Sequence, residues 1–143
     1  MKNKIEKSFY IGLLLICGLM FSNMSFSQER NGFQELEASL FLDQIMEENN
    51  HILIDVRTAE DYQKGRIQGA VNAPESTVMN ALLDTIDCDR PVLIYCYYGK
   101  RSRMAAEKML EKYDVKIYCL AGGLIAWKDQ GYKLDTKRIR KKK

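Results

Sequence analysis

The chain has 143 residues, of which 46% are hydrophobic and 29% charged, and its formal net charge is +3 at pH 7. That length allows one ordinary domain. Six of the 22 basic residues fall in the last seven positions, so residues 28–136 carry 13 basic and 18 acidic side chains. A domain with this charge balance is not expected to bind nucleic acid, because it lacks the excess of basic residues that such a surface needs.

The first 27 residues have the pattern of a secretory signal peptide. Three lysines among the first seven residues are followed by an apolar run at 9–21 and then by a polar stretch. Ser25 and Ser27 occupy the −3 and −1 positions of a small-residue cleavage site. We therefore expect cleavage after Ser27, an N-terminal extension at 28–35, and an exported protein that is periplasmic or secreted.

Two other fates of this leader stay open. Its apolar run is 13 residues long, whereas a membrane-spanning helix needs about 20 residues, so an uncleaved anchor is disfavoured. Lipidation of Cys17 is the second alternative, and it is disfavoured because Ile16 stands where a lipobox has a small residue. We expect no stable membrane insertion once the leader is removed.

Short apolar runs alternate with amphipathic segments behind the leader. The predicted strands are 34–38, 52–54, 70–73, 91–95 and 115–120. The predicted helices are 40–48, 59–62, 75–83, 102–113 and 123–129. Ser39 and Thr58 are the expected N-caps of the first two helices, and Met104 is expected to face inward from the fourth.

The character of the strands predicts the fold class. Residues 52–54 and 91–95 are almost wholly apolar, which is typical of strands covered on both faces. Strands that alternate with helices form parallel sheets. We therefore predict an α/β domain at 36–134, with a five-stranded, mainly parallel sheet and helices on both faces. Residues 135–143 form a basic tail that is expected to be disordered, and contact with an acidic surface is the alternative.

The ends of the strands predict where a functional site lies. In parallel sheets, sites form beyond the carboxyl ends of the strands, and Asp55, Cys96 and Leu120 lie at or directly after such ends. His51, the single histidine, precedes its strand and should lie at the opposite edge, about 13 Å away at about 3.3 Å per residue. A catalytic Cys–His pair is therefore not expected.

The loop after residue 95 is expected to bind an anion. It reads Cys96-Tyr97-Tyr98-Gly99-Lys100-Arg101-Ser102. Successive backbone N–H groups and the positive end of the following helix converge on such a loop, and Lys100 and Arg101 add two formal charges. All of these effects favour a thiolate at Cys96 over a thiol. Cys96 is therefore a candidate nucleophile, and the alternative is a small buried apolar residue.

The cysteine count bears on redox state and on metal binding. Cys88, Cys96 and Cys119 remain after leader removal, and an odd number in an exported protein leaves at least one thiol free or paired outside the chain. The sequence has no C-x-x-C motif and no Cys/His cluster, so no metal site is expected. Cys119 is either an inert buried cysteine or a resolving thiol for Cys96. Whether Cys96 pairs with Cys119 or Cys88 stays open.

Three motifs in order make the sequence resemble the single-domain rhodanese family. One is the loop pattern Cys-x-x-Gly-x-Arg-Ser at 96–102. The upstream motif consists of Asp55-Val56-Arg57, Glu60, Tyr62, Gly65, Ile67, Gly69-Ala70, Asn72 and Pro74. The downstream motif consists of Leu120, Gly122-Gly123, Trp127 and Gly131-Tyr132. The resemblance covers about residues 36–134. It departs from the family at Arg66, where histidine is usual, and at Lys133, where proline is usual.

Loop length separates two reactions within this resemblance. Four residues lie between Cys96 and Arg101. Related cell-cycle phosphatases and tyrosine phosphatases have a Cys-x5-Arg loop, whose extra residue makes room for a phosphate. The shorter loop suits the outer sulfur of a persulfide, so the resemblance implies sulfur transfer.

The resemblance implies a thiosulfate sulfurtransferase that uses neither cofactor nor metal. Cys96 would take a sulfane sulfur from thiosulfate or a related small-molecule donor and pass it to a thiol or to cyanide. The substrate- and persulfide-binding residues would be Tyr97, Tyr98, Gly99, Lys100, Arg101 and Ser102. Two alternatives stay open: a persulfide- or anion-binding partner module without turnover, and, less favoured, a phosphatase or arsenate-reductase-like enzyme.

Other motif residues are expected to support this loop. Asp55 and Arg57 would form a buried or semi-buried ion pair that orients the loop, with direct contact to substrate as the alternative. Gly122 and Gly123 would let the last loop pass close to the catalytic one. Trp127 is expected to fill the core.

Overall fold

The computed structural model describes residues 32–47, 50–85 and 90–138. The predicted leader, Cys88 and residues 139–143 of the basic tail lie outside these ranges. Among the helices of the described residues, none combines the length and apolar character needed to cross a bilayer.

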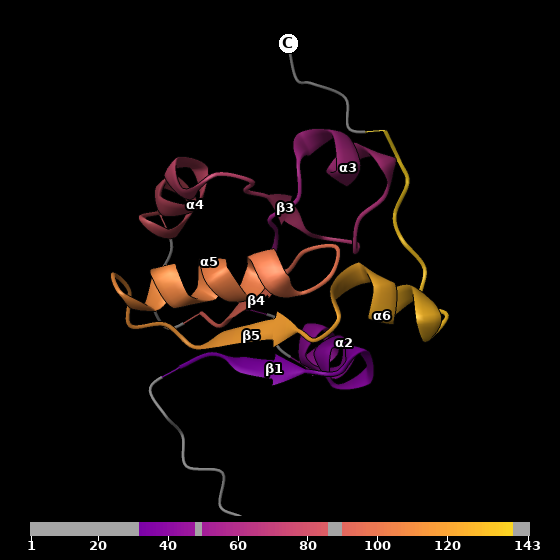
Figure 1. Cartoon of the computed structure of the whole chain (residues 1–143), viewed down its shortest axis with the longest axis horizontal. Helices are drawn as coiled ribbons and strands as arrows, with labels where there is room; N and C mark the ends of the chain where they lie inside the picture. Colours follow the sequence, from indigo (N-terminus) through magenta and orange to yellow (C-terminus); the bar gives the residue numbers. More distant parts are fainter. Residues whose placement is uncertain (1–31, 48–49, 86–89, 139–143) are drawn as a thin grey trace, which may run out of the picture. The chain divides into compact units, whose positions relative to one another are not determined.

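Strands and helices alternate from Gln34 to Asp129 (Figure 1). The strands are β1 (Gln34–Leu36), β2 (Ile52–Asp55), β3 (Val71–Asn72), β4 (Val92–Tyr95) and β5 (Ile117–Leu120). The helices are α2 (Ala38–Glu47), α3 (Ala59–Lys64), α4 (Ser76–Leu83), α5 (Lys100–Leu110) and α6 (Gly123–Asp129). Each predicted strand overlaps an observed one, and α6 has the predicted bounds.

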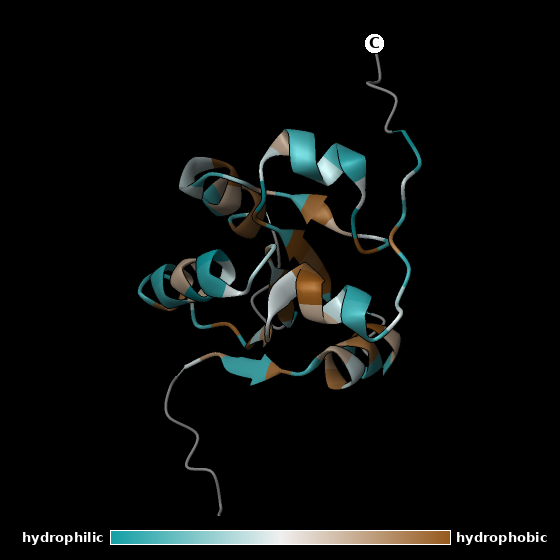
Figure 2. Cartoon of the chain, turned by 45° about the vertical axis from the view of Figure 1, so that its right-hand side comes forward, coloured by the Kyte–Doolittle hydropathy of each residue, from teal (hydrophilic) through white to brown (hydrophobic). Residues whose placement is uncertain are grey.

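The five strands form one sheet in the order β1-β5-β4-β2-β3, and every neighbouring pair is parallel. β2, β4 and β5 are buried along their whole length. The edge strand β1 is hydrophilic except at its last residue (Figure 2), and a short polar edge is a poor template for pairing with another chain. The predicted five-stranded parallel sheet is confirmed.

Each face of the sheet has its own core. Alternate side chains of β2, β4 and β5, such as Ile54 and Ile94, pack under α4 and α5 on one face. The intervening side chains, such as Leu93 and Leu120, pack against α2, α3 and α6 on the other face. Figure 1 shows α5 lying along β4 and β5. Trp127 belongs to the second core and is 3% exposed, which confirms its predicted role.

Two helices begin earlier than the sequence predicted. α2 begins at Ala38, because the amide of Phe41 already donates to the carbonyl of Glu37 at 2.8 Å, so Ser39 is not an N-cap. α5 begins at Lys100 instead of Ser102, because Gly99 adopts a left-handed φ of 87° that turns the chain directly into the helix. The predicted cap of α3 is confirmed, since the Thr58 side chain accepts from the Asp61 amide at 3.3 Å.

The inward face of α5 also differs from the prediction. Met104, which was expected to face inward, is 51% exposed. The buried positions of α5 are Ser102, Ala106 and Met109. Met104 therefore lies on the solvent-facing side of α5, where its side chain lines a surface groove.

Residues after 134, the predicted end of the domain, also contact the domain. Arg66 and Asp135 exchange two backbone hydrogen bonds of 3.1 and 2.7 Å. The Arg66 guanidinium pairs with the Asp135 carboxylate at 2.8 Å, donates to the Lys137 carbonyl at 3.0 Å, and lies 5.1 Å from the ring centre of Tyr62. Arg66, at which the chain departs from the family pattern, thus holds a C-terminal strap, residues 134–137, against the domain.

Candidate active site

The carboxyl ends of β2, β4 and β5 meet at one edge of the sheet. Asp55 pairs with Tyr95, and Ile94 pairs with Cys119. The loops after these strands therefore open at one edge, as predicted, and the middle loop begins with Cys96. His51 precedes β2 at the opposite edge, where its carbonyl accepts from Arg90 at 3.1 Å.

The sulfur of Cys96 lies inside its loop and the residue is 2% exposed. The Gly99 amide donates to Cys96 Sγ at 3.1 Å, and the Ser102 hydroxyl lies 3.6 Å from the same sulfur. That hydroxyl also donates to the Gly99 carbonyl at 2.9 Å. Because it has one proton, it can serve only one of these acceptors at a time. The sulfur therefore has a backbone donor and a hydroxyl within hydrogen-bonding reach.

The first turn of α5 adds to this electrostatic environment. Lys100, Arg101 and Ser102 begin the helix, and the amides of a first turn have no partner within their own helix. The positive end of the α5 dipole is therefore directed at the loop that holds Cys96.

The first turn of α6 holds the Cys96 loop in place. The amide of Leu124 donates to the Cys96 carbonyl at 3.0 Å, and that of Ile125 donates to the Tyr97 carbonyl at 3.2 Å. Gly123 has a φ of +62°, and a Cβ at this position would lie 2.5 Å from the Cys96 carbonyl oxygen and 2.7 Å from the Gly99 nitrogen. The close approach predicted for Gly122 and Gly123 is confirmed, and a side chain at Gly123 is excluded by space as well as by torsion.

The other side chains of the loop lie toward solvent. Tyr98 is 72% exposed and Tyr97 38%, and their rings meet edge to face at 4.8 Å. Lys100 and Arg101 are exposed, and neither belongs to an ion pair among the described residues. Their charges are therefore available to attract an anion to the mouth of the loop, and direct contact of these residues with a substrate stays a prediction.

Asp55 and Arg57 form the predicted ion pair, and both residues are buried. Arg57 Nη2 lies 2.6 Å from Asp55 Oδ2, and its Nε donates to both carboxylate oxygens at 3.0 Å. Burial opposes the charge of Arg57, but the hydrogen bonds and charge of Asp55 outweigh it, so the pKa of Arg57 is raised.

The role of this pair differs in part from the prediction. Arg57 Nη2 also donates to the Gly65 carbonyl at 2.6 Å, and the Asn72 amide donates to the carbonyls of Asp55 and Arg57 at 3.0 and 2.9 Å. These hydrogen bonds brace the segment between β2 and β3 instead of the Cys96 loop itself. Support for the loop is therefore indirect.

Tyr95 connects the pair to the strand that carries Cys96, and sequence analysis did not single it out. The Arg57 guanidinium lies 6.0 Å from the ring centre of Tyr95. The Tyr95 hydroxyl accepts a hydrogen bond from the Ile67 amide at 3.1 Å. Burial, and then the charge of Asp55, raises the pKa of Tyr95. The available signal was a tyrosine in the otherwise aliphatic run Val-Leu-Ile-Tyr, because a buried hydroxyl needs a partner.

Cys119 is a free thiol on β5 and is fully buried, as is expected of an inert cysteine. Burial raises the pKa of Cys119 to about 12. Its strand partner is Ile94, two residues before Cys96. Strands about 4.8 Å apart with a rise of about 3.3 Å per residue put such a diagonal pair of Cα atoms about 8 Å apart, whereas a disulfide needs less than about 7 Å. A bond between Cys119 and Cys96 therefore requires the backbone to move.

The described residues contain no group of three or more His, Cys, Asp or Glu side chains that is arranged as a metal site. The site is thus built from one thiol, the backbone amides around it, a serine hydroxyl and two cationic side chains.

Fold and loop together define an α/β domain that holds a buried free cysteine at the carboxyl edge of a parallel sheet. Residues 38–130 match the family of rhodanese-like domains, and the chain belongs to this family. It is 34% identical over 104 residues to the thiosulfate sulfurtransferase GlpE of Actinobacillus succinogenes, an alignment that covers 73% of this chain and 92% of that protein.

Solved structures show the same fold. A rhodanese-related protein of Thermoplasma volcanium superposes with a TM-score of 0.62 at 20% identity, covering 73% of this chain and 99% of the other. A thiosulfate sulfurtransferase of Pseudomonas aeruginosa superposes with a TM-score of 0.66 at 21% identity, covering 76% of this chain and 21% of the longer one. The rhodanese-like α/β fold is therefore confirmed.

Proposed function

We propose that this protein is a thiosulfate sulfurtransferase that carries sulfur as a persulfide on Cys96. The observation that carries the proposal is the buried sulfur, 3.1 Å from the Gly99 amide, in a loop that begins at the carboxyl edge of β4. Membership of the rhodanese-like family and the similarity to a thiosulfate sulfurtransferase support it.

In the first step the Cys96 thiolate attacks the sulfane sulfur of thiosulfate. A sulfur–sulfur bond forms at Cys96 Sγ while the bond to the sulfonate group breaks, and its electron pair leaves with sulfite. The persulfide that remains is an anion, and the loop amides together with the Ser102 hydroxyl stabilise it as preorganised donors. Lys100 and Arg101 attract the doubly charged donor.

In the second step a nucleophile, either cyanide or a thiolate, attacks the outer sulfur. The new bond forms as the bond between Sγ and the outer sulfur breaks, and its electron pair returns to Sγ as the thiolate. The same donors that held the persulfide then hold the regenerated thiolate. No external oxidant or reductant is needed.

The test is sulfur loading followed by turnover. Incubation with thiosulfate should add the mass of one sulfur atom to the protein, release sulfite, and support thiocyanate formation from cyanide. Cys96→Ser should abolish all three, whereas Cys119→Ser keeps the nucleophile and serves as the matched control. A Cys96→Ser variant that turns over at the wild-type rate would contradict the proposal.

The same samples distinguish the two alternative functions. A partner module without turnover would gain the sulfur mass and fail to pass the sulfur to cyanide. A phosphatase or arsenate-reductase-like enzyme would hydrolyse an aryl phosphate or reduce arsenate and would leave thiosulfate unchanged. The spacing of four residues between Cys96 and Arg101 favours the smaller persulfide ligand.

We further propose that the leader is removed after Ser27 and that the protein acts outside the cytoplasm. The basic, apolar and small-residue sequence of the leader supports this. An activated thiolate is readily oxidised when it is exposed, and the 2% exposure of Cys96 limits that reaction. The intact mass of protein purified from an exporting host should correspond to a chain that starts at Gln28. A mass that includes residue 1, or a lipid on Cys17, would contradict this proposal.

A further inference from the structure

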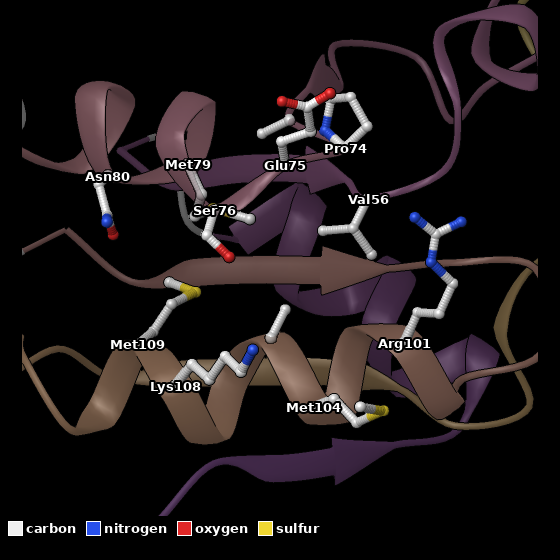
Figure 3. Close-up of a pocket in the computed structure, with 12 residues that line it drawn as sticks. Val56, Pro74, Glu75, Ser76, Met79, Asn80, Arg101, Met104, Lys108 and Met109 are labelled. Atoms are coloured by element: carbon white, nitrogen blue, oxygen red, sulfur yellow. The ribbon is translucent and has the colours of Figure 1, made fainter.

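A groove lies between α4 and α5, beside the Cys96 loop (Figure 3). Its volume is about 190 Å³. Val56, Met79 and Met109 form an apolar floor, and all three belong to the core cluster that also contains Cys96. Of the Cys96 loop, Arg101 is the residue that lines the groove, so one end of the groove adjoins the loop at this side chain.

The walls of the groove carry more positive than negative charge. Arg101 lies at the end next to the loop and Lys108 lies farther along α5 (Figure 3). Seven helical residues correspond to a rise of about 10 Å, so the two cations are about two turns apart. Both are exposed, and neither belongs to an ion pair within the described ranges. Glu75 is the single carboxylate that lines the groove. An anionic occupant is therefore favoured over a cationic one.

The size of the groove limits the occupant further. Pockets for drug-sized ligands have volumes of roughly 300–1,000 Å³, and this groove is smaller. It fits a small, extended molecule that would lie over Met79 and Met109 while its charged end remained near solvent at Lys108.

We propose that this groove is the acceptor subsite and that it selects low-molecular-weight thiols that carry a carboxylate. The inference rests on the proposed function, because the thiol must reach a persulfide on Cys96. The thiol end lies toward Arg101, and the carboxylate lies toward Lys108. There the acceptor thiolate bonds to the outer sulfur, the bond to Sγ breaks, and its electron pair returns to Cys96 as the thiolate. The transferred sulfur keeps its negative charge and leaves as the persulfide anion of the acceptor.

The first test reverses the charge at the far end of the groove. Three acceptors are compared with thiosulfate as donor: glutathione, which carries carboxylates, neutral 2-mercaptoethanol, and cationic cysteamine. For each thiol the kcat/KM of Lys108→Glu is divided by that of the wild type, so that intrinsic thiol reactivity cancels. The ratio should fall about tenfold for glutathione, which corresponds to about 1.4 kcal/mol. It should not fall for cysteamine, and the effect should shrink as salt is added. A ratio that is the same for all three thiols would overturn the proposal.

The second test blocks the groove without changing its charge. Ser76 and Thr77 are exposed neighbours on α4, and of the two only Ser76 lines the groove. Ser76→Phe should raise the KM for glutathione several-fold, whereas Thr77→Phe should behave as the wild type. Equal KM values for these two variants would place glutathione somewhere else.

Sulfur loading of Cys96 by thiosulfate distinguishes failure of the proposed sulfurtransferase function from failure of the groove assignment. A wild-type protein that neither gains sulfur nor turns over cyanide refutes the proposed function, and the acceptor subsite with it. If loading and cyanide turnover are present but Lys108→Glu does not discriminate among the thiols, the groove assignment alone is wrong. Loading of each variant also shows that it is folded.

Discussion

Among the glycines of the described residues, Gly123 leaves the least room for a Cβ atom. It begins α6, whose first amides donate to the carbonyls of Cys96 and Tyr97. Gly131 also has a positive φ, of 80°, but nothing lies within 4 Å of a Cβ added there. A substitution at Gly131 therefore tests the cost of the backbone torsion alone, whereas one at Gly123 tests that cost together with a steric clash.

Alanine substitution at these positions should have unequal effects. Gly131→Ala should lower the free energy of unfolding by about 1–2 kcal/mol, the usual difference for a left-handed residue that gains a Cβ. Gly123→Ala should lower it by more and should slow sulfur loading at least about tenfold, because the Cys96 loop must shift to admit the methyl group. Urea unfolding and the rate of mass gain measure the two effects. Similar stability and full loading in both variants would show that the α6 contact does not position the loop.

Among the elements, β2 and β3 depend on a buried ion pair. Asp55 is fully buried and has one strong cationic partner, Arg57, which also reaches the Gly65 carbonyl. Breaking a buried pair leaves an uncompensated charge, whereas replacing both partners by neutral groups costs much less. The pair therefore contributes to the geometry of the segment between β2 and β3 more than to net stability.

Neutralising one partner should destabilise the domain more than neutralising both. Asp55→Asn should lower the free energy of unfolding by about 3–5 kcal/mol. Adding Arg57→Met to that variant should recover part of the loss, because the unpaired guanidinium is then absent. A double-mutant cycle by urea unfolding measures this. A double variant less stable than Asp55→Asn would contradict the interpretation.

The C-terminal strap is a second element held by a long-range pair. Asp135 accepts from Arg66 and, through its other carboxylate oxygen, from the Lys137 amide at 2.9 Å. Asp135→Asn should weaken both contacts and lower stability by about 1–3 kcal/mol. Limited proteolysis should then release residues after the strap more rapidly. Asp129→Asn, at an exposed position on α6, is the control, and equal protease sensitivity of the two variants would show that Asp135 does not hold the strap.

At the scale of the whole molecule, buried neutral acids couple stability to alkaline pH. Burial raises the pKa of Tyr62, Tyr95 and Cys119, and for Cys119 the value is about 12. As the pH rises, such a group loses its proton first in the unfolded chain, so the unfolded state binds fewer protons than the folded one. The free energy of unfolding therefore falls as the pH rises from the ordinary pKa of the group in the unfolded chain towards its higher pKa in the folded protein.

Cys119→Val isolates one of these groups. Between pH 9 and pH 11 the wild type should lose about 2 kcal/mol more than the variant, since one unit of pKa difference corresponds to about 1.4 kcal/mol. Urea unfolding of both proteins at pH 8, 9, 10 and 11 gives the difference. A gap between the two proteins that does not change with pH would show that Cys119 is not the group that titrates.

The parts of this molecule that could be predicted from sequence are those encoded by neighbouring residues. The strands are short apolar runs, and the candidate loop contains the proposed nucleophile, the glycine donor and the serine within residues 96–102. The start of α5 was missed because a left-handed Gly99 replaces the usual side-chain cap. The Arg66–Asp135 pair joins residues 69 positions apart, and no local pattern indicates such a contact. The exposure of Met104 depends on the space between two helices, which local periodicity does not define.

The contact between α6 and the Cys96 loop also determines when the site is completed during synthesis. A ribosome releases the chain from its N-terminus, so Cys96 and the whole of α5 emerge before the residues at 123–125 that donate to the loop. Because domains fold as units as they emerge, a nascent chain that ends before α6 lacks the amides that donate to the carbonyls of Cys96 and Tyr97. The arrangement of the Cys96 loop is thus completed only when nearly the entire domain has been made. Under the proposed function, shorter translation intermediates would carry no finished sulfur site.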